Sequence, residues 1–324
     1  MNISNKMLLF ILTFVLFEIL IFPNTIFCIT VSLQEPELKY KQQIGSIGTG
    51  DGQFMYPHSL AIDGDGNIYV GDTGNKRIQK FSSNGTFLTS WGSEGSREGQ
   101  FLGLHDVAVD PTNKFIYSLE LKNHRVQKFS PNGTFIEKWG YNGTGGRDSL
   151  RTPHQIAVNS LGNVYLTDTR GNQILKFSNN GSFMGTMGSK GIKPGEFNSP
   201  HGIAIDSDNN IYLTDMKNSR IQIFNSSDKF IREWGSFGNS TGQFSLTAPG
   251  IAVDNDGNRI YVLDKVRALV QVFDSHGKYL GETGTPGTGP GQFKKPEDIA
   301  VDNKGAIYIT DTRNSRIAVF ETIP

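Results

Sequence analysis

One unit of about 48 residues occurs six times in this chain, and this repetition is the strongest constraint on its fold. The unit is recognised by a polar residue that closes a short apolar stretch, at Asp63, Asp110, Asn159, Asp206, Asp254 and Asp302. Repeats of roughly 40–50 residues with strand-like content are typical of propeller blades. The sequence therefore predicts an all-β fold, a six-bladed β-propeller, with blades starting near residues 57, 104, 153, 200, 248 and 296.

Each unit contains the pattern of four consecutive strands. In the first unit, residues 59–62 and 68–70 predict two short strands separated by a polar turn. Residues 77–81 place apolar Ile78 and Phe81 among polar side chains and predict a half-buried third strand. Asn84-Gly85 then predicts a tight hairpin turn, because both residues tolerate positive φ. We expect four-stranded antiparallel blades that pack face to face and leave few exposed edges.

The two ends of the chain complement each other. The sixth unit ends at residues 320–324, directly after its third strand. The missing outer strand is present near the N-terminus, at residues 38–44. We therefore predict that this N-terminal strand pairs in the last blade and closes the ring.

An acidic residue and an arginine recur around the turn between the second and third strands. Asp72 and Arg77 hold these positions in the first unit, and Asp311 and Arg316 in the sixth. A short-range ion pair or an Asx turn that stabilises each blade is the expected role.

Residues 1–30 differ from the rest of the chain. Lys6 precedes an apolar run over residues 7–22, which Pro23 ends. This pattern predicts a secretory signal peptide or, if it is retained, an N-terminal membrane anchor. Residues 31–324 would then form the propeller, exported to the cell surface or the extracellular space. Cys28 is the only cysteine, so the propeller has no disulfide framework.

Six Asn-x-Ser/Thr sequons after residue 30 suit an exported protein. They lie at Asn84, Asn132, Asn142, Asn180, Asn225 and Asn239. Three of them are also the Asn of an Asn-Gly turn, so turn chemistry alone explains their presence. We expect the sequons on exposed outer turns, where glycosylation is feasible.

Histidine is concentrated at one repeat position, immediately before the first strand. The six units place His58, His105, His154, His201, Pro249 and Glu297 there. First strands line the central channel of a propeller, so these residues should surround one of its mouths. Imidazole and carboxylate groups are ligands of zinc and other divalent metals. His105, His201 and Glu297, from alternate blades, would form a two-histidine, one-carboxylate set, with His58 and His154 as further candidates.

The repeated pattern resembles the NHL repeat. Residues 57–81 carry it in full, from Pro57 through Gly66-Asn67-Ile68-Tyr69 to Phe81. The resemblance covers nearly the whole chain after residue 30 and implies the propeller fold. NHL propellers include enzymes, nucleic-acid binders and protein-binding modules, so fold alone does not decide function.

The Pro-His motifs also resemble one enzymatic branch, the peptidyl-α-hydroxyglycine α-amidating lyases. In that branch, histidines in Pro-His contexts on alternate blades hold a catalytic zinc. His58 and His154 match this context, but Pro249 stands where the third ligand of that triplet is expected. No counterpart of that branch's substrate-binding arginine and tyrosine is evident.

Two function classes therefore remain. The first is a non-enzymatic binding scaffold that contacts a protein, peptide or glycan at the channel mouth. The second is a metal-dependent lyase or hydrolase built on the histidine ring. The 31 basic and 31 acidic residues give zero net charge, which disfavours nucleic acid as a partner. We expect a monomer, with contact to a membrane only through residues 1–30.

Overall fold

The structure, a computed structural model, describes residues 17–22, 25–30, 37–140, 150, 152–245 and 250–323. The chain divides into a small unit, residues 1–36 with 324, and a large unit, residues 37–323. In the small unit, β1 (Phe17–Phe22) pairs antiparallel with β2 (Thr25–Thr30). None of the described residues forms a helix long and apolar enough to cross a membrane. The role predicted for residues 1–30 remains a prediction.

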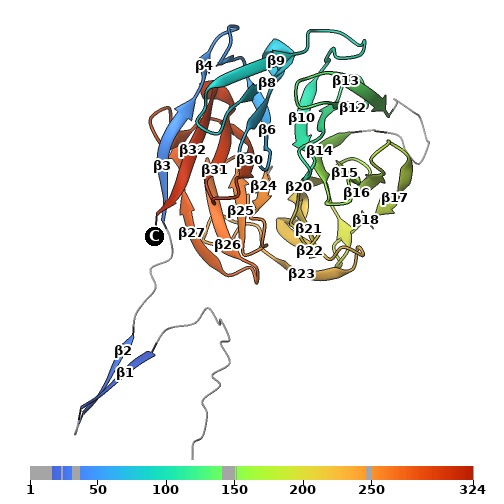
Figure 1. Cartoon of the computed structure of the whole chain (residues 1–324). Coiled ribbons are helices and arrows are strands. Elements are labelled where there is room, and N and C mark those ends of the chain that lie inside the picture. The colour runs from blue at the N-terminus through green and yellow to red at the C-terminus, as the bar shows by residue number, and fades with distance from the viewer. Residues whose placement is uncertain are drawn as a thin grey trace, which may run out of the picture. The chain divides into compact units, whose positions relative to one another are not determined.

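The large unit consists of six four-stranded antiparallel sheets (Figure 1). The first is β6 (Pro57–Ile62), β7 (Ile68–Asp72), β8 (Arg77–Phe81) and β9 (Phe87–Trp91). The second is β10 (Leu104–Val109), β11 (Ile116–Glu120), β12 (Arg125–Phe129) and β13 (Phe135–Trp139). The third is β14 (Pro153–Val158), β15 (Val164–Asp168), β16 (Gln173–Phe177) and β17 (Phe183–Met187).

The remaining three blades follow the same order. The fourth is β20 (Pro200–Ile205), β21 (Ile211–Asp215), β22 (Arg220–Phe224) and β23 (Phe230–Trp234). The fifth is β24 (Ile251–Val253), β25 (Arg259–Asp264), β26 (Leu269–Asp274) and β27 (Tyr279–Thr283). The sixth is β30 (Pro296–Val301), β31 (Ile307–Asp311), β32 (Arg316–Ile323) and β3 (Glu37–Ile44). The predicted six-bladed, all-β fold is confirmed.

Strand β3 comes from the other end of the chain. It pairs antiparallel with β32, with Tyr40 opposite Phe320 and Ile44 opposite Ile317. The rings of Tyr40 and Phe320 meet edge to face, with centroids 5.7 Å apart. The strand predicted over residues 38–44 thus completes the sixth blade.

The core lies between blades. Six buried clusters occur, one at each junction of neighbouring blades. At the junction that joins the last blade to the first, Leu60 and Phe54 share a cluster with Tyr308 and Val319. The first strands likewise lie beside one another in a closed cycle, from β6 through β10, β14, β20, β24 and β30 back to β6. Burial of large apolar side chains, worth about 1.5–3 kcal/mol each, therefore holds the ring together.

Short elements occupy the face where the first strands begin. Among the described residues, three two-residue pairs lie in the links between blades: β4 (Ser46–Ile47) with β5 (Gln53–Phe54), β18 (Ser189–Lys190) with β19 (Glu196–Phe197), and β28 (Thr285–Pro286) with β29 (Gln292–Phe293). In the same part of the chain, three single-turn 3₁₀ helices follow second strands: η1 (Thr73–Asn75), η2 (Met216–Asn218) and η3 (Thr312–Asn314).

Buried ion pairs fix these turns. Arg316 Nε donates to Asp311 Oδ2 at 2.8 Å, and its Nη2 donates to the carbonyl oxygens of Gly289 and Gln292. Arg77 with Asp72 and Arg220 with Asp215 repeat this arrangement, at 2.9 and 2.8 Å. The ion pair predicted for each repeat is confirmed in these blades. It ties the turn after the second strand to the link that leads into the first strand.

Candidate functional site

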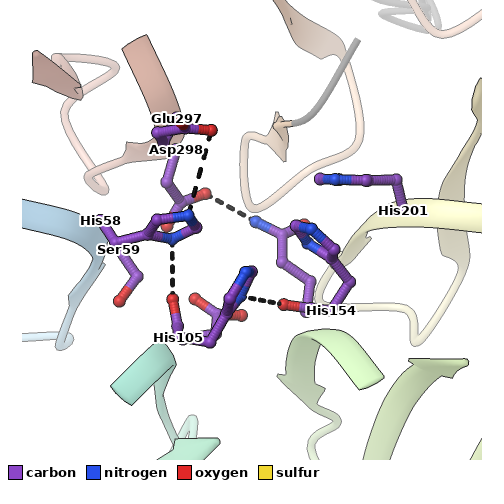
Figure 2. Close-up of a pocket in the computed structure, with 9 residues that line it drawn as sticks. His58, Ser59, His105, His154, His201, Glu297 and Asp298 are labelled. Carbon is purple, nitrogen blue, oxygen red and sulfur yellow. Dashed lines mark hydrogen bonds and ion pairs between the residues drawn. The ribbon is translucent and has the colours of Figure 1, made fainter. Parts of the chain in front are cut away.

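The residues predicted at the channel mouth do come together. His58, His105, His154, His201 and Glu297 all line one small pocket, as Figure 2 shows. Each is the second residue of its first strand, in β6, β10, β14, β20 and β30. The fifth blade's Pro249 lies outside the described residues.

The four imidazoles pack side by side around the pocket. The ring centroids of His58 and His105, and of His105 and His154, are 4.1 Å apart. The centroids of His154 and His201 are 3.3 Å apart. Rings this close form one cluster, in which a positive charge on one would repel a charge on the next.

Hydrogen bonds to the backbone set the tautomer of two of these histidines. His58 Nδ1 lies 2.9 Å from the carbonyl oxygen of His105, and His105 Nδ1 lies 2.9 Å from that of His154. A carbonyl oxygen only accepts, so each Nδ1 carries the proton and each Nε2 keeps its lone pair. His154 Nδ1 is buried and has no hydrogen-bond partner among the described residues.

Three of these histidines favour the neutral form. Burial, with nearby Lys265, lowers the pKa of His58 to about 4. Burial also holds the pKa of His105 and of His154 well below the ordinary value, with the neighbouring imidazoles adding to the effect. His58, His105 and His154 therefore present nitrogen lone pairs and C–H edges, and no net charge.

Glu297 is the one acidic group in the ring of predicted residues. Its side chain is 5% exposed and lies 4.0 Å from His58 Nε2. Lys265 Nζ donates to its Oε2 at 2.5 Å, and Lys295 Nζ lies 3.6 Å from its Oε1. The carboxylate is thus already neutralised by two lysines.

A second polar layer, missed by the sequence analysis, closes the floor of the pocket. Gln155 Nε2 donates to Asp298 Oδ1 at 2.6 Å, which joins the third blade to the opposite sixth blade. Asp298 Oδ2 also accepts from Leu60 N at 3.0 Å, and Asp106 Oδ2 accepts from Ile156 N at 2.7 Å. Burial raises the pKa of Asp298 to about 7 and that of Asp106 well above its ordinary value. We call Asp106, Gln155 and Asp298 the floor layer.

The floor layer separates two spaces of different size. On the histidine side, the pocket has a volume of about 10 Å³, close to what one water molecule needs. On the other side, a channel of about 190 Å³ runs between the first strands, lined by aliphatic residues such as Leu60, Val107 and Ile203. Asp106, Gln155 and Asp298 line both spaces.

The predicted metal set is only partly in place. Nδ1 donation to a carbonyl, seen at His58 and His105, is the usual second-sphere contact of a metal-bound histidine. A third ligand is not positioned, because Glu297 is held by the lysines. Within the described ranges, no three His, Cys, Asp or Glu side chains converge as a metal site. As the side chains lie, they do not fit a three-ligand zinc centre.

None of the sequon asparagines within the described residues lines this pocket. Asn84, Asn132, Asn180 and Asn239 are exposed, while Asn225 is half-buried and accepts from Ser227 N and Lys229 N. Asn142 lies outside the described residues. Their glycosylation remains a prediction.

The fold and this channel mouth define a six-bladed β-propeller of NHL type. The family described as 6-bladed beta-propeller, DUF5128, matches residues 144–236 and 243–322, more than half of the chain, and the NHL repeat matches residues 54–81. The chain therefore belongs to this six-bladed propeller family.

Individual relatives match over short stretches. NHL repeat-containing protein 3 of Homo sapiens is 36% identical over 78 residues, which are 24% of this chain and 21% of that protein. Protein brain tumor of Drosophila melanogaster is 35% identical over 77 residues, which are 24% of this chain and 7% of that protein. The chain thus aligns with 21% or less of the length of these relatives.

Solved structures match over most of the chain. Virginiamycin B lyase from Staphylococcus aureus superposes with a TM-score of 0.59 at 16% identity, covering 89% of this chain and 100% of that one. A protein of unknown function from Bacteroides thetaiotaomicron gives a TM-score of 0.66 at 18% identity, covering 89% and 76%. At such identity the likeness shows the fold alone.

Proposed function

We propose that this propeller is a binding scaffold whose protein, peptide or glycan ligand lies across the channel mouth. The observation that carries this proposal is the size of the mouth pocket. Its volume of about 10 Å³ is far below the roughly 300–1,000 Å³ of pockets that hold small-molecule ligands. The Gln155–Asp298 hydrogen bond also blocks the way into the channel. A ligand of ordinary size contacts the face around the mouth instead of entering it.

The face around the mouth suits a contact surface. Tyr56, directly before the first strand of blade one, is 51% exposed, and Val266 in a turn of blade five is 64% exposed. The turns on this face are held by buried ion pairs, so little conformational entropy is lost when a partner binds. Protein-binding modules are also known among NHL-type propellers.

Site-specific photocrosslinking tests this proposal. A photoreactive amino acid replaces Val266 at the mouth or, as a control, Leu161, which is 74% exposed in a turn at the opposite ends of the strands. The proposal predicts a defined crosslinked product from position 266 and none from position 161. Equal products from both positions, or none from position 266, would contradict it.

We also propose that the protein acts as a monomer outside the cell or at its surface, with residues 1–30 directing export. The apolar run over residues 7–22 and the five exposed or half-exposed sequons within the described residues support this. The intact mass of protein recovered from its native host shows whether residues 1–30 are cleaved or retained and whether the protein is glycosylated. Light scattering of the same protein gives the oligomeric state. Recovery of full-length, unmodified protein from the cytosol alone would contradict export.

A second candidate is a metal-dependent lyase or hydrolase at the same mouth. One observation favours it: His58 and His105 both donate Nδ1–H to carbonyls and keep Nε2 available, as metal ligands do. A bound divalent metal would supply Lewis acidity there, and these two imidazoles would hold it. This candidate predicts metal-dependent turnover that the His105→Ala/His201→Ala variant abolishes. Turnover that survives the substitutions, or no turnover at all, would exclude it.

A further inference from the structure

Positive charge is gathered on the mouth face of an otherwise neutral protein. Six cationic side chains stand around the histidine cluster, and we call them the cationic rim: Lys122, Arg170, Lys217, Lys265, Lys295 and Arg313. All are exposed except Lys265, whose side chain is 28% exposed. The only acid among the residues that line the mouth pocket on this side of the floor is Glu297.

Repeat geometry places these cations at the mouth. Lys122, Arg170, Lys217 and Arg313 each stand two residues after the acidic residue that ends a second strand. Backbone bonds hold those turns on the links that lead into the first strands: Lys217 N donates to Asn198 O, and Arg313 N donates to Lys294 O, both at 3.0 Å.

Side-chain contacts bring the same turns to the next blade's mouth position. Thr312 Oγ1 donates to Pro57 O at 2.8 Å, and Thr169 Oγ1 donates to Pro200 O at 2.8 Å, one residue before His58 and His201. The Arg313 guanidinium lies 5.8 Å from the ring centre of Tyr56, across the boundary between the sixth and first blades. The rim therefore follows the circumference of the mouth.

Most rim charges have no acidic partner. Over the described residues, no carboxylate lies within 4.0 Å of the cationic groups of Lys122, Arg170, Lys217 or Arg313. By contrast, two cations on outer strands are paired: Lys138 with Glu98 at 3.3 Å, and Lys41 with Glu321 at 3.0 Å. Unpaired cations that converge on one face attract an anionic partner and accelerate its association.

We propose that the ligand of this mouth is an acidic peptide segment of a partner protein, whose carboxylates contact the cationic rim. The proposal rests on the proposed function, because it names the chemistry of the ligand at the same site. Exposed hydrophobic side chains on the links and turns of this face include Ile47, Ile192 and Val266, beside Tyr56 and Phe237. The three aliphatic side chains contact peptide side chains well but offer no stacking surface to nucleotide bases, and Tyr56 and Phe237 are the minority that could stack. This mixture favours a peptide over a single-stranded nucleic acid.

The histidines beneath the rim are compatible with this ligand. His58, His105 and His154 are neutral, so they add no charge to that of the rim. Glu297 reduces the positive charge of the rim, because its carboxylate pairs with Lys265 and Lys295. Removing that carboxylate should free two cations and strengthen the binding of an acidic peptide.

Fluorescence anisotropy on the full-length protein tests the proposal. The probe is a labelled Glu/Leu/Ser peptide, compared with the same peptide carrying Gln at every Glu. Relative to wild type, Lys122→Gln/Arg170→Gln/Lys217→Gln should weaken binding of the acidic peptide about tenfold. Glu297→Gln should strengthen it about threefold or more. Added salt should weaken it, whereas the Gln peptide should bind poorly throughout.

A matched control removes three other unpaired, exposed lysines. Lys114, Lys278 and Lys304 lie in turns at the opposite ends of the strands. Lys114→Gln/Lys278→Gln/Lys304→Gln has the same net charge as the rim variant and should bind within about twofold of wild type. Equal losses in the two triple variants would overturn the proposal, because they would show an effect of net charge without a site.

The remaining outcomes separate this inference from the proposed function. If the Gln peptide binds as tightly as the acidic one and crosslinks at position 266, the scaffold function stands and the acidic ligand is refuted. If a single-stranded RNA or an acidic polysaccharide binds more tightly than the peptide and depends on the rim, the peptide is refuted as the ligand. If no probe depends on any mouth residue, both proposals fail.

Discussion

The hydrogen bond that crosses the channel gives a prediction about how the mouth is held. Gln155→Ala removes two buried contacts: the bond from Nε2 to Asp298 Oδ1, at 2.6 Å, and the bond that Oε1 accepts from Ile203 N, at 2.9 Å. At about pH 8, above the pKa of about 7 to which burial raises Asp298, the carboxylate is mostly charged. A hydrogen bond to a charged group contributes about 1.5–3 kcal/mol, and a buried N–H left without a partner costs about 1–3 kcal/mol. We therefore expect the free energy of unfolding to fall by about 3–5 kcal/mol.

Urea-induced unfolding measures this loss, and Ser59→Ala is the matched control. Ser59 lines the same pocket at the equivalent position of the first blade, and its buried Oγ has no hydrogen-bond partner among the described residues. Its removal should change the free energy of unfolding by no more than about 0.5 kcal/mol. If Gln155→Ala and Ser59→Ala have equal effects, the floor layer does not hold the opposite blades together, and the reasoning is wrong.

Three further substitutions test the blade architecture. Tyr308→Phe should lower stability by about 1 kcal/mol at neutral pH, through loss of the bond to Asp302. Burial raises the pKa of Tyr308 to about 12. As pH rises from about 10 to about 12, the Tyr308 hydroxyl ionises mainly in the unfolded chain. The free energy of unfolding of the wild type should therefore fall by about 2 kcal/mol more than that of the variant. Equal falls of the two proteins in urea titrations would contradict this. Arg316→Leu leaves Asp311 buried without its cation and should cost about 3–5 kcal/mol, seen as a lower melting temperature, whereas an unchanged melt would refute the structural role of the pair. Tyr40→Ala should cost about 1–2 kcal/mol and expose β3 to limited proteolysis; unchanged protection would mean that this ring does not anchor the strand.

The repeat made the fold predictable because each blade carries its own complete set of local signals. Turn residues such as Asn84-Gly85, apolar alternation and the Asp311–Arg316 pair all act within one unit or its neighbour. Even the long-range pairing of β3 with β32 could be predicted, since the sixth unit lacked a strand that the N-terminus supplied. The gathering of four histidines at one mouth followed from the same register.

The floor layer could not be predicted, for a physical reason. Simple alternation along a strand points neighbouring residues to opposite faces, so His105 and Asp106 should not face the same space. The register of β10 shifts between Leu104 and Asp106, and that of β30 shifts between Pro296 and Ile299. These bulges let adjacent residues share the channel, and a bulge has no reliable mark in a single sequence.

The cationic rim was missed for a different reason. The net charge of zero averages over the whole surface, so it conceals an uneven distribution. Lys122, Arg170, Lys217 and Arg313 share one repeat position, and an alignment of the six units by that position would have shown it. Such an alignment does not show which carboxylates lie near each cation, because those distances are set only in the folded chain.

We propose that the channel mouth is a contact surface, and a metal-dependent catalytic centre is the alternative. The most direct test is the metal content of the full-length protein purified from its native host without chelators, measured beside His105→Ala/His201→Ala. For a contact surface, we expect less than about one-tenth equivalent of any divalent metal in both proteins, and no tight binding when zinc is added. About one equivalent of metal in the wild type that is lost in the double variant would contradict the claim.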